Sequence, residues 1–350
     1  MAYTTINKSG DYFNTKLWSG NNGTQAITGV GFQPDWLWIK ARTGASNNHR
    51  LVDAVRGVTK VIYSSSNSAE GTASGVPQSF DSDGFTLNTS DSAINGNGVN
   101  YVGWNWKANG QGSSNTDGSI NTTYTSVNTT AGFSISKYTG TGANATFGHG
   151  LGVKPDIVFW KRLDNSAGAV NWIVQSPLLG NQTKLVLNTS DASSTGSSFS
   201  QTDNWTNSLI DLKTYEGENS SGGTYIAYAF ASKTGYSKFG SYTGNGNADG
   251  TFVYTGFKPA FLMIKKSSAS GNNWFIYDNK RPGYNEIDQK LYANGSDAEE
   301  DSTYNNLDLL SNGFKLRTTD GDSNASGGTF IYMAFGQSIV GSNNVPCTAR

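Results

Sequence analysis

The chain has 350 residues, enough for two or three domains, and its formal net charge is −1 at a pI of about 6.1. This balance disfavours an electrostatic grip on nucleic acid or on an anionic membrane surface, so neither is expected as a partner. Charged residues make up 15% of the chain, and Gly, Ser, Thr and Asn take their place.

The sequence has no 18-residue apolar run and no basic segment followed by an apolar one, so we expect no membrane insertion and no Sec signal peptide. The single cysteine, Cys347, excludes a disulfide framework within the chain. Aromatic residues reach 12%, and turn-forming residues fill most of the remainder. Because no long segment has helical apolar spacing, the composition predicts an all-β protein.

The first element with a clear pattern is the stretch GFQPDWLWIK, residues 31–40. Proline can begin a strand without loss of a ladder hydrogen bond. Four apolar residues then place Trp36 and Trp38 on one face and Leu37 and Ile39 on the other. Both faces must therefore be covered, and Lys40 is expected to mark the return to solvent.

Two further stretches along the chain resemble this one: GVKPDIVFWK at residues 152–161 and GFKPAFLMIK at residues 256–265. Each is preceded by an aromatic-x-Gly triplet and followed by a short apolar strand. Each copy closes with an aromatic strand, at residues 101–106, 225–230 and 330–335. A DGF element precedes this strand at residues 83–85, is matched by NGF at 312–314, and is degenerate at 209–212.

These landmarks predict three internal repeats of about 100 residues, which is too long for a solenoid repeat. We expect tandem antiparallel β-sandwiches, jelly-roll-like, with repeat 2 packed against repeat 3. The predicted boundaries are 1–107 for repeat 1, 108–131 for a flexible Gly/Ser/Thr/Asn linker, 132–235 for repeat 2, 236–336 for repeat 3, and 337–350 for a polar tail. The tail is a candidate docking peptide.

Most large aromatic residues fall at alternating strand positions, which is typical of core packing rather than of ligand binding. The small residues Gly103, Ala227 and Ala229 are expected where a neighbouring aromatic ring packs closely. The predicted repeat core consists of Trp36, Trp38, Phe159, Trp160, Phe261, Trp104 and Trp106.

Trp205 differs from these residues because it lies in the polar run TDNWTN. It is therefore the candidate exposed aromatic residue for binding a glycan. The alternative is that it caps one end of a sandwich.

The run Asp320-Gly-Asp322-Ser-Asn324 has the alternating oxygen donors of a calcium loop but lacks its closing glutamate. A solvated turn is the favoured interpretation of these three residues, with calcium as the alternative. We expect no other cofactor.

Glu286-Ile287-Asp288 resembles the core of a retaining glucanase motif, but Leu291 stands where the second glutamate is required. His49 and His149, the only histidines, fall at different positions of the repeat. No catalytic triad or zinc spacing can be built from them, so the sequence favours a non-enzymatic protein.

The motifs GFQPDWLWIK, FDSDGFTL (residues 80–87) and NGVNYVGWNWKA (residues 97–108) resemble a repeat family in virion structural proteins of bacteriophages, notably marine ones. The opening residues 1–17 are also similar to the start of such proteins. The resemblance covers most of repeat 1 and weakens over repeats 2 and 3. It implies a β-sandwich fold and a place on the virion, after synthesis in the bacterial host cytoplasm, and it supplies no catalytic residues.

Two functions are compatible with this resemblance. The first is a capsid-decorating knob, fibre or cement protein, favoured because repeat 1 begins near Met1 and no heptad or collagen-like shaft is present. The second is a tail-associated adhesin that binds a host surface glycan, favoured by Asn-rich loops. Other virion proteins are the expected partners, and a homo-oligomer is the default, with a trimer favoured.

Overall fold

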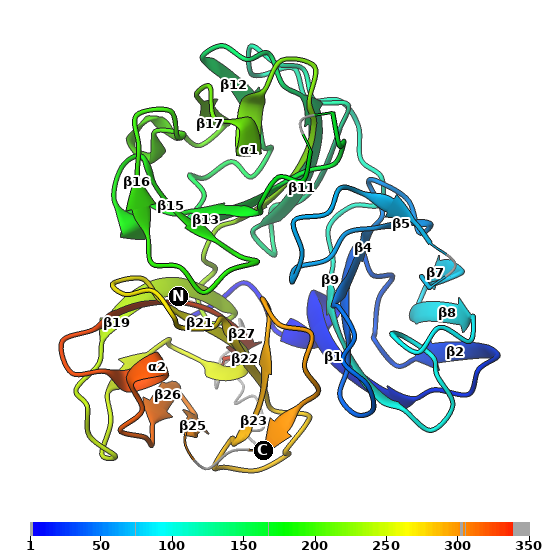
Figure 1. Ribbon diagram of the computed structural model, residues 1–350, viewed down its shortest axis with the longest axis vertical. Helices are drawn as coiled ribbons and strands as arrows, with labels where there is room; N and C mark the ends of the chain where they lie inside the picture. The colour runs from blue at the N-terminus through cyan, green and yellow to red at the C-terminus, as the bar shows by residue number, and fades with distance from the viewer. Residues whose placement is uncertain (1–2, 74, 167, 302–303, 305, 339–350) are drawn as a thin grey trace.

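The computed structural model describes residues 3–73, 75–166, 168–301, 304 and 306–338 of the chain. It consists of antiparallel sheets, with only two single-turn α-helices and three 3-10 turns among these residues. The all-β antiparallel prediction is therefore confirmed. Figure 1 shows three lobes around a common centre, which we call unit 1 (blue to cyan), unit 2 (green) and unit 3 (yellow to red).

Unit 1 follows the 3-10 turn η1 (Ser9–Asp11) and pairs a larger sheet, in the order β1-β9-β3-β4, with a smaller one, β2-β8-β7, beside the short pair β5-β6. Its strands are β1 (Phe13–Ser19), β2 (Thr24–Thr28), β3 (Trp36–Ala41), β4 (Arg50–Asp53), β5 (Lys60–Val61), β6 (Gly71–Thr72), β7 (Ser79–Asp81), β8 (Gly84–Asn88) and β9 (Asn100–Trp106).

Unit 2 has the larger sheet β10-β11-β18-β13-β14-β15-β16 and the smaller sheet β12-β17. Its elements are β10 (Tyr124–Asn128), β11 (Phe133–Thr139), β12 (Ala145–Gly148), β13 (Ile157–Arg162), β14 (Ile173–Gln175), η2 (Pro177–Leu179), β15 (Thr183–Val186), β16 (Ser194–Thr195), η3 (Thr202–Asn204), β17 (Leu209–Leu212), α1 (Glu216–Asn219) and β18 (Thr224–Phe230).

Unit 3 has the larger sheet β19-β27-β21-β22-β23-β24 and the smaller sheet β20-β26-β25. Its elements are β19 (Ser237–Thr243), β20 (Phe252–Tyr254), β21 (Lys258–Lys266), β22 (Phe275–Asp278), β23 (Gln289–Tyr292), β24 (Glu300–Asp301), β25 (Leu307–Leu310), β26 (Gly313–Leu316), α2 (Gly321–Asn324) and β27 (Thr329–Gln337).

One strand order occurs in all three larger sheets. The opening strand of each unit (β1, β11, β19) pairs with the closing strand (β9, β18, β27), which pairs in turn with the strand formed by the apolar run of the proline motif, called the motif strand (β3, β13, β21). The next strand in sequence (β4, β14, β22) lies on the far side of the motif strand. The motif strand is therefore central in each sheet.

Both faces of each motif strand are buried, as its uninterrupted apolar run predicts. Leu37 and Ile39 point into the sandwich core of unit 1, whereas Trp36 and Trp38 point into a second core that contains side chains of all three units. The alternation is the same in units 2 and 3. All seven predicted core residues are buried: Trp36, Trp38, Phe159, Trp160, Phe261, Trp104 and Trp106.

Aromatic rings from the three units meet in this shared core. Trp36 of unit 1 stacks on Tyr228 of unit 2, with ring centroids 4.5 Å apart. The final aromatic residues of the closing strands also meet, since the Phe335 centroid lies 5.8 Å from those of Trp106 and Phe230. Repeats 2 and 3 pack together as expected, and unit 1 packs against both of them.

The predicted flexible linker, residues 108–131, is structured in part, and that prediction is wrong for its second half. Tyr124–Asn128 form strand β10, which pairs with β11 at the edge of the larger sheet. Ile120 is buried in the core of unit 2, and the backbone amides of Ala108 and Gly110 donate to the carboxylate of Asp35. The few apolar residues of this segment, spaced widely among Gly, Ser and Thr, are enough to hold it against the core of unit 2.

The predicted contact at Gly103 is present: a Cβ atom there would lie 3.0 Å from the ring of Trp18. The predicted docking tail, residues 337–350, lies outside the described residues after Ser338. Gln337 ends β27, and its side-chain oxygen accepts a hydrogen bond from the Ser9 amide, so the described ends of the chain meet.

We expect the shared core to make the three units unfold together. Trp36→Ala removes a ring that contacts both Trp106 and Tyr228, and should lower the free energy of unfolding by about 3–5 kcal/mol. Chemical denaturation followed by fluorescence and circular dichroism should show one cooperative transition for both proteins. The control, Phe252→Ala on an outer strand, should change stability by less than about 0.5 kcal/mol. Selective loss of one of several separate transitions would contradict the shared core.

Candidate functional site

The glycan candidate Trp205 is buried, with 3% of its surface exposed, so the prediction of an exposed ring is wrong. Its Nε1 donates to Ser200 Oγ at 2.8 Å, and its ring packs edge-on against Trp160. The alternative interpretation, a cap at one end of a sandwich, describes its position in the core of unit 2. A polar neighbourhood in sequence did not imply exposure because η3 folds the ring back onto β13.

The calcium candidates Asp320, Asp322 and Asn324 form a hydrogen-bonded turn around α2. Asp320 accepts from the Asp322 amide and caps this helix. Asn324 is buried; its Nδ2 donates to Asn245, Asn247 and Thr318, and its Oδ1 accepts from the Asn245 amide. These bonds explain the sequence pattern without a cation. Within the described residues, no three His, Cys, Asp or Glu side chains come together as a metal site would require.

Sequence reasoning missed that this asparagine has a counterpart in every unit. Asn95 and Asn219 are also buried, and each joins the loop after the opening strand to the turn before the closing strand. A signal was present, because each asparagine stands six residues before the first aromatic residue of a closing strand: Asn95 before Tyr101, Asn219 before Tyr225, and Asn324 before Phe330.

The predicted return to solvent at Lys40 is wrong, because Lys40, Lys161 and Lys265 are all fully buried. Each ammonium group donates to a backbone carbonyl of its own unit and to one of another unit. The acceptors in the other unit are Ser296 for Lys40, Asn67 for Lys161, and Ser190 for Lys265. The contacts therefore run from unit 1 to unit 3, from unit 3 to unit 2, and from unit 2 to unit 1, which closes a ring.

A second set of contacts follows the same ring. Trp172 Nε1 donates to the carbonyl of Tyr63, and Trp274 Nε1 donates to that of Val186. His49 occupies the corresponding place in unit 1, with its Nε2 2.9 Å from the carbonyl of Tyr292. Because His49 Nδ1 accepts from Trp38 Nε1, its proton lies on Nε2. Burial lowers the pKa of His49 well below its usual value, so the ring is neutral and structural.

Two buried ion pairs complete the junctions of unit 1. Asp53 binds Arg56 and accepts from the Tyr228 hydroxyl, and Asp278 binds Arg281 and accepts from Trp104 Nε1. These polar groups are engaged in contacts between units.

Two further acidic residues, Glu286 and Glu218, are candidates for acid–base chemistry. Glu286 is exposed and pairs with the Asn306 amide, and Leu291, where the glucanase motif needs a carboxylate, is buried. Burial raises the pKa of Glu218 to about 8, but this side chain is enclosed in unit 2 and accepts a hydrogen bond from the Ser200 backbone amide. Neither arrangement brings two carboxyl groups to one accessible position.

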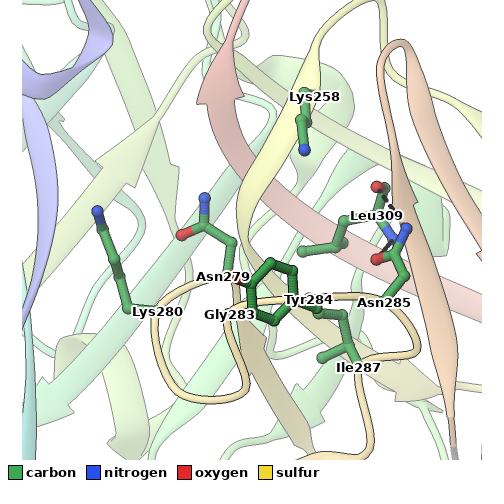
Figure 2. A pocket seen from close by; sticks show the side chains of 8 residues that line it. All are labelled: Lys258, Asn279, Lys280, Gly283, Tyr284, Asn285, Ile287 and Leu309. Carbon is green, nitrogen blue, oxygen red and sulfur yellow. Dashed lines mark hydrogen bonds between the residues drawn. The ribbon is translucent and has the colours of Figure 1, made fainter. Parts of the chain in front are cut away.

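An accessible pocket of about 520 Å³ with polar and charged lining residues lies in unit 3 (Figure 2). It lies where β21 begins and β22 ends, beside β25. The lining residues are Lys258, Asn279, Lys280, Gly283, Tyr284, Asn285, Ile287 and Leu309. Sequence reasoning assigned binding to Trp205 and missed this pocket, although Gly283-Tyr284-Asn285 is a polar run with an aromatic residue of the same kind.

One protein family covers all three units. A model of the domain of unknown function DUF7483 matches residues 8–338. The chain belongs to the DUF7483 family. This DUF7483 match spans units 1, 2 and 3, in agreement with their shared core. No curated protein matches the sequence. Within the described residues, no helix has the length and apolar character needed to cross a membrane.

The three buried lysines predict an unusual pH dependence. Burial lowers the pKa of Lys40, Lys161 and Lys265 to about 8 in each case. Between this value and the ordinary value near 10.5, the unfolded chain binds more protons than the folded chain, so the free energy of unfolding should rise with pH. We expect a gain of the order of 1–3 kcal/mol per lysine, which would begin near pH 8. Denaturant titrations at intervals from pH 7.5 to 9.5 test this before tyrosine ionisation opposes it.

Lys265→Met tests whether the buried lysines cause this pH dependence. It should reduce the rise with pH by roughly one third, and it should cost about 2–4 kcal/mol at pH 7 because the Asn272 carbonyl loses its donor and the Ser190 carbonyl loses one of its donors. Lys266→Met, at the neighbouring and more exposed lysine, is the matched control. Stability that is flat or falling between pH 8 and 9.5 in the unmodified protein would contradict the burial of charged lysines.

Proposed function

We propose that this chain is a non-enzymatic structural protein on the surface of a phage virion, and that it decorates the capsid as a knob, fibre or cement protein. The observation that carries this proposal is the closed ring of three units. The groups that could perform chemistry, including the three motif lysines, His49 and the buried Asp–Arg pairs, are engaged in holding the units together. A rigid, self-contained body is what a particle surface requires.

The arrangement also suits attachment to a symmetric shell. Three units whose larger sheets share one strand order surround a common centre. A body of this shape can meet three equivalent neighbours on a shell with a local threefold axis. The resemblance of GFQPDWLWIK, FDSDGFTL and NGVNYVGWNWKA to phage virion proteins supports the same proposal.

The second candidate function is a tail-associated adhesin that binds a host surface glycan. The pocket of unit 3 favours it, because Tyr284 at its rim is 85% exposed. A tyrosine ring beside a pocket can pack against the face of a sugar, which is the contact that such an adhesin requires.

Reconstruction of the intact particle by cryo-electron microscopy tests the proposal and separates the two candidates. We expect density that matches the three-unit ring on the capsid shell. Density on the tail alone would favour the adhesin. Particles that lack the chain by both reconstruction and mass spectrometry would overturn the virion proposal.

Native mass spectrometry of the purified chain tests the proposed homo-oligomer. A trimer should appear at three times the chain mass of 37.3 kDa. The faces that join the units are already buried within one chain, so a trimer would have to use the outer faces of the ring. A species of 37.3 kDa alone, at concentrations up to about 50 μM, well above a micromolar dissociation constant, would contradict stable self-association.

A further inference from the structure

The pocket in unit 3 exists because one connection is longer there than in the other two units. Ten residues separate the paired residues Leu51 and Ile62 in unit 1, and ten separate Val174 and Leu185 in unit 2, whereas fourteen separate Ile276 and Leu291 in unit 3. Residues 283–287 of this longer connection supply half of the pocket lining. The flanking strands pair in the same way in the three units, so the extra residues are a local addition to a common frame.

The residue types also change at matched positions. Asn279 and Lys280 stand where unit 1 has Ala54 and Val55. In unit 2 the same positions hold Pro177 and Leu178. Unit 3 therefore has hydrogen-bonding and positively charged groups where its counterparts are apolar. The fold does not require polar residues at these two positions, because units 1 and 2 form the same flanking strands with apolar residues there.

The longer connection is held firmly at both ends. At its start, the buried pair Asp278–Arg281 binds the turn, and Asp278 also accepts from the Lys280 amide. At its far end, the Asn285 side chain both donates to and accepts from the backbone of Leu309. These contacts fix the two ends of the connection before any ligand arrives, which reduces the entropic cost of binding.

We infer that this pocket binds an anionic sugar residue of a surface polysaccharide. Lys258 and Lys280 both line it, and Lys280 is exposed, so its ammonium group is placed to meet negative charge in a ligand. Figure 2 shows the Tyr284 ring at the mouth and Asn279 between the two lysines. The inference deepens the adhesin candidate and rests on the proposed exposure of the chain on a particle.

Each part of such a ligand has a matching group. The exposed tyrosine ring can pack against the C–H face of a sugar. A lysine ammonium can pair with its carboxylate or phosphate. Asn279 lines the pocket, and its side-chain amide can exchange hydrogen bonds with a sugar hydroxyl. A simple inorganic anion would pair with a lysine but would not use the tyrosine or the asparagine amide.

The test is binding of purified full-length protein to an array of oligosaccharides, followed by calorimetry on those that bind. The probes are galacturonate, glucuronate, mannuronate and sialylated oligomers, phosphorylated glycans, neutral dextran oligomers, and inorganic phosphate. We expect an acidic oligosaccharide to bind, neutral dextran to bind at least tenfold more weakly, and phosphate not to compete at millimolar concentration. Phosphorylated and carboxylated glycans are separated by which of them binds.

Two variants with matched controls assign the binding to this pocket. Tyr284→Ala and Lys280→Gln should each weaken binding by about tenfold. Tyr304→Ala removes another tyrosine, 74% exposed, that does not line the pocket, and Lys154→Gln changes the lysine of unit 2 that corresponds to Lys258. Both controls should bind as the unmodified protein does. All four altered side chains are wholly or partly exposed, so unchanged thermal denaturation is expected.

Several results would overturn the inference. These are no binding to any acidic oligosaccharide, equal binding of neutral dextran, full competition by phosphate, or equal effects of the control and pocket variants. Its failure is distinguishable from failure of the proposed function. If the chain is on the particle but binds no acidic glycan, the structural proposal stands and the ligand inference fails. If the chain binds an acidic glycan but is absent from particles, the ligand inference stands and the structural proposal fails.

Discussion

The whole arrangement depends on the burial of three lysine ammonium groups at the junctions between units. A buried charge without hydrogen-bond partners is strongly destabilising, so each ammonium must meet several carbonyl oxygens at once. Lys161, for example, donates to Arg162 and Val170 of its own unit and to Asn67 of unit 1. Because the acceptors belong to two units, the hydrogen bonds are complete only when the units are docked. The aromatic core provides most of the driving force, and the lysines fix the geometry in which it forms.

The three junctions share this frame but differ in polarity. Where unit 1 meets unit 2, Tyr228 binds the buried Asp53, and where unit 3 meets unit 1, Trp104 binds Asp278. The corresponding positions at the third junction are Ser176 and Met333, and Ser176 bonds within its own unit instead. An acidic residue at position 176 would face a thioether with no proton to donate. The acidic residue and its donor are therefore both present at two junctions and both replaced at the third, an arrangement that leaves neither partner buried alone.

Local patterning predicted much of the fold but little of the packing between units. The apolar alternation from Trp36 to Ile39 correctly indicated a central strand with both faces covered. It could not indicate that one covering layer comes from other units, because the residues involved are about 100 or more positions away. Lys40 and Trp205 were misjudged for the same reason: both look exposed among their sequence neighbours and are buried by distant ones. The pocket of unit 3 was missed because its lysines and tyrosine converge only when β21 and the loop after β22 lie side by side.

Three units in one chain permit a kind of specialisation that three identical chains do not. In a homotrimer, every substitution is made three times, so a longer loop that disturbed one junction would disturb all of them. Here the connection after β22 could lengthen while those after β4 and β14 stayed short, and the ring contacts of Lys40 and Lys161 were left intact. The added residues carry Tyr284 outward, away from the shared core, and they are anchored through Asp278 and Asn285. All three units contribute to the ring contacts, and unit 3 carries in addition the longer connection that lines the pocket.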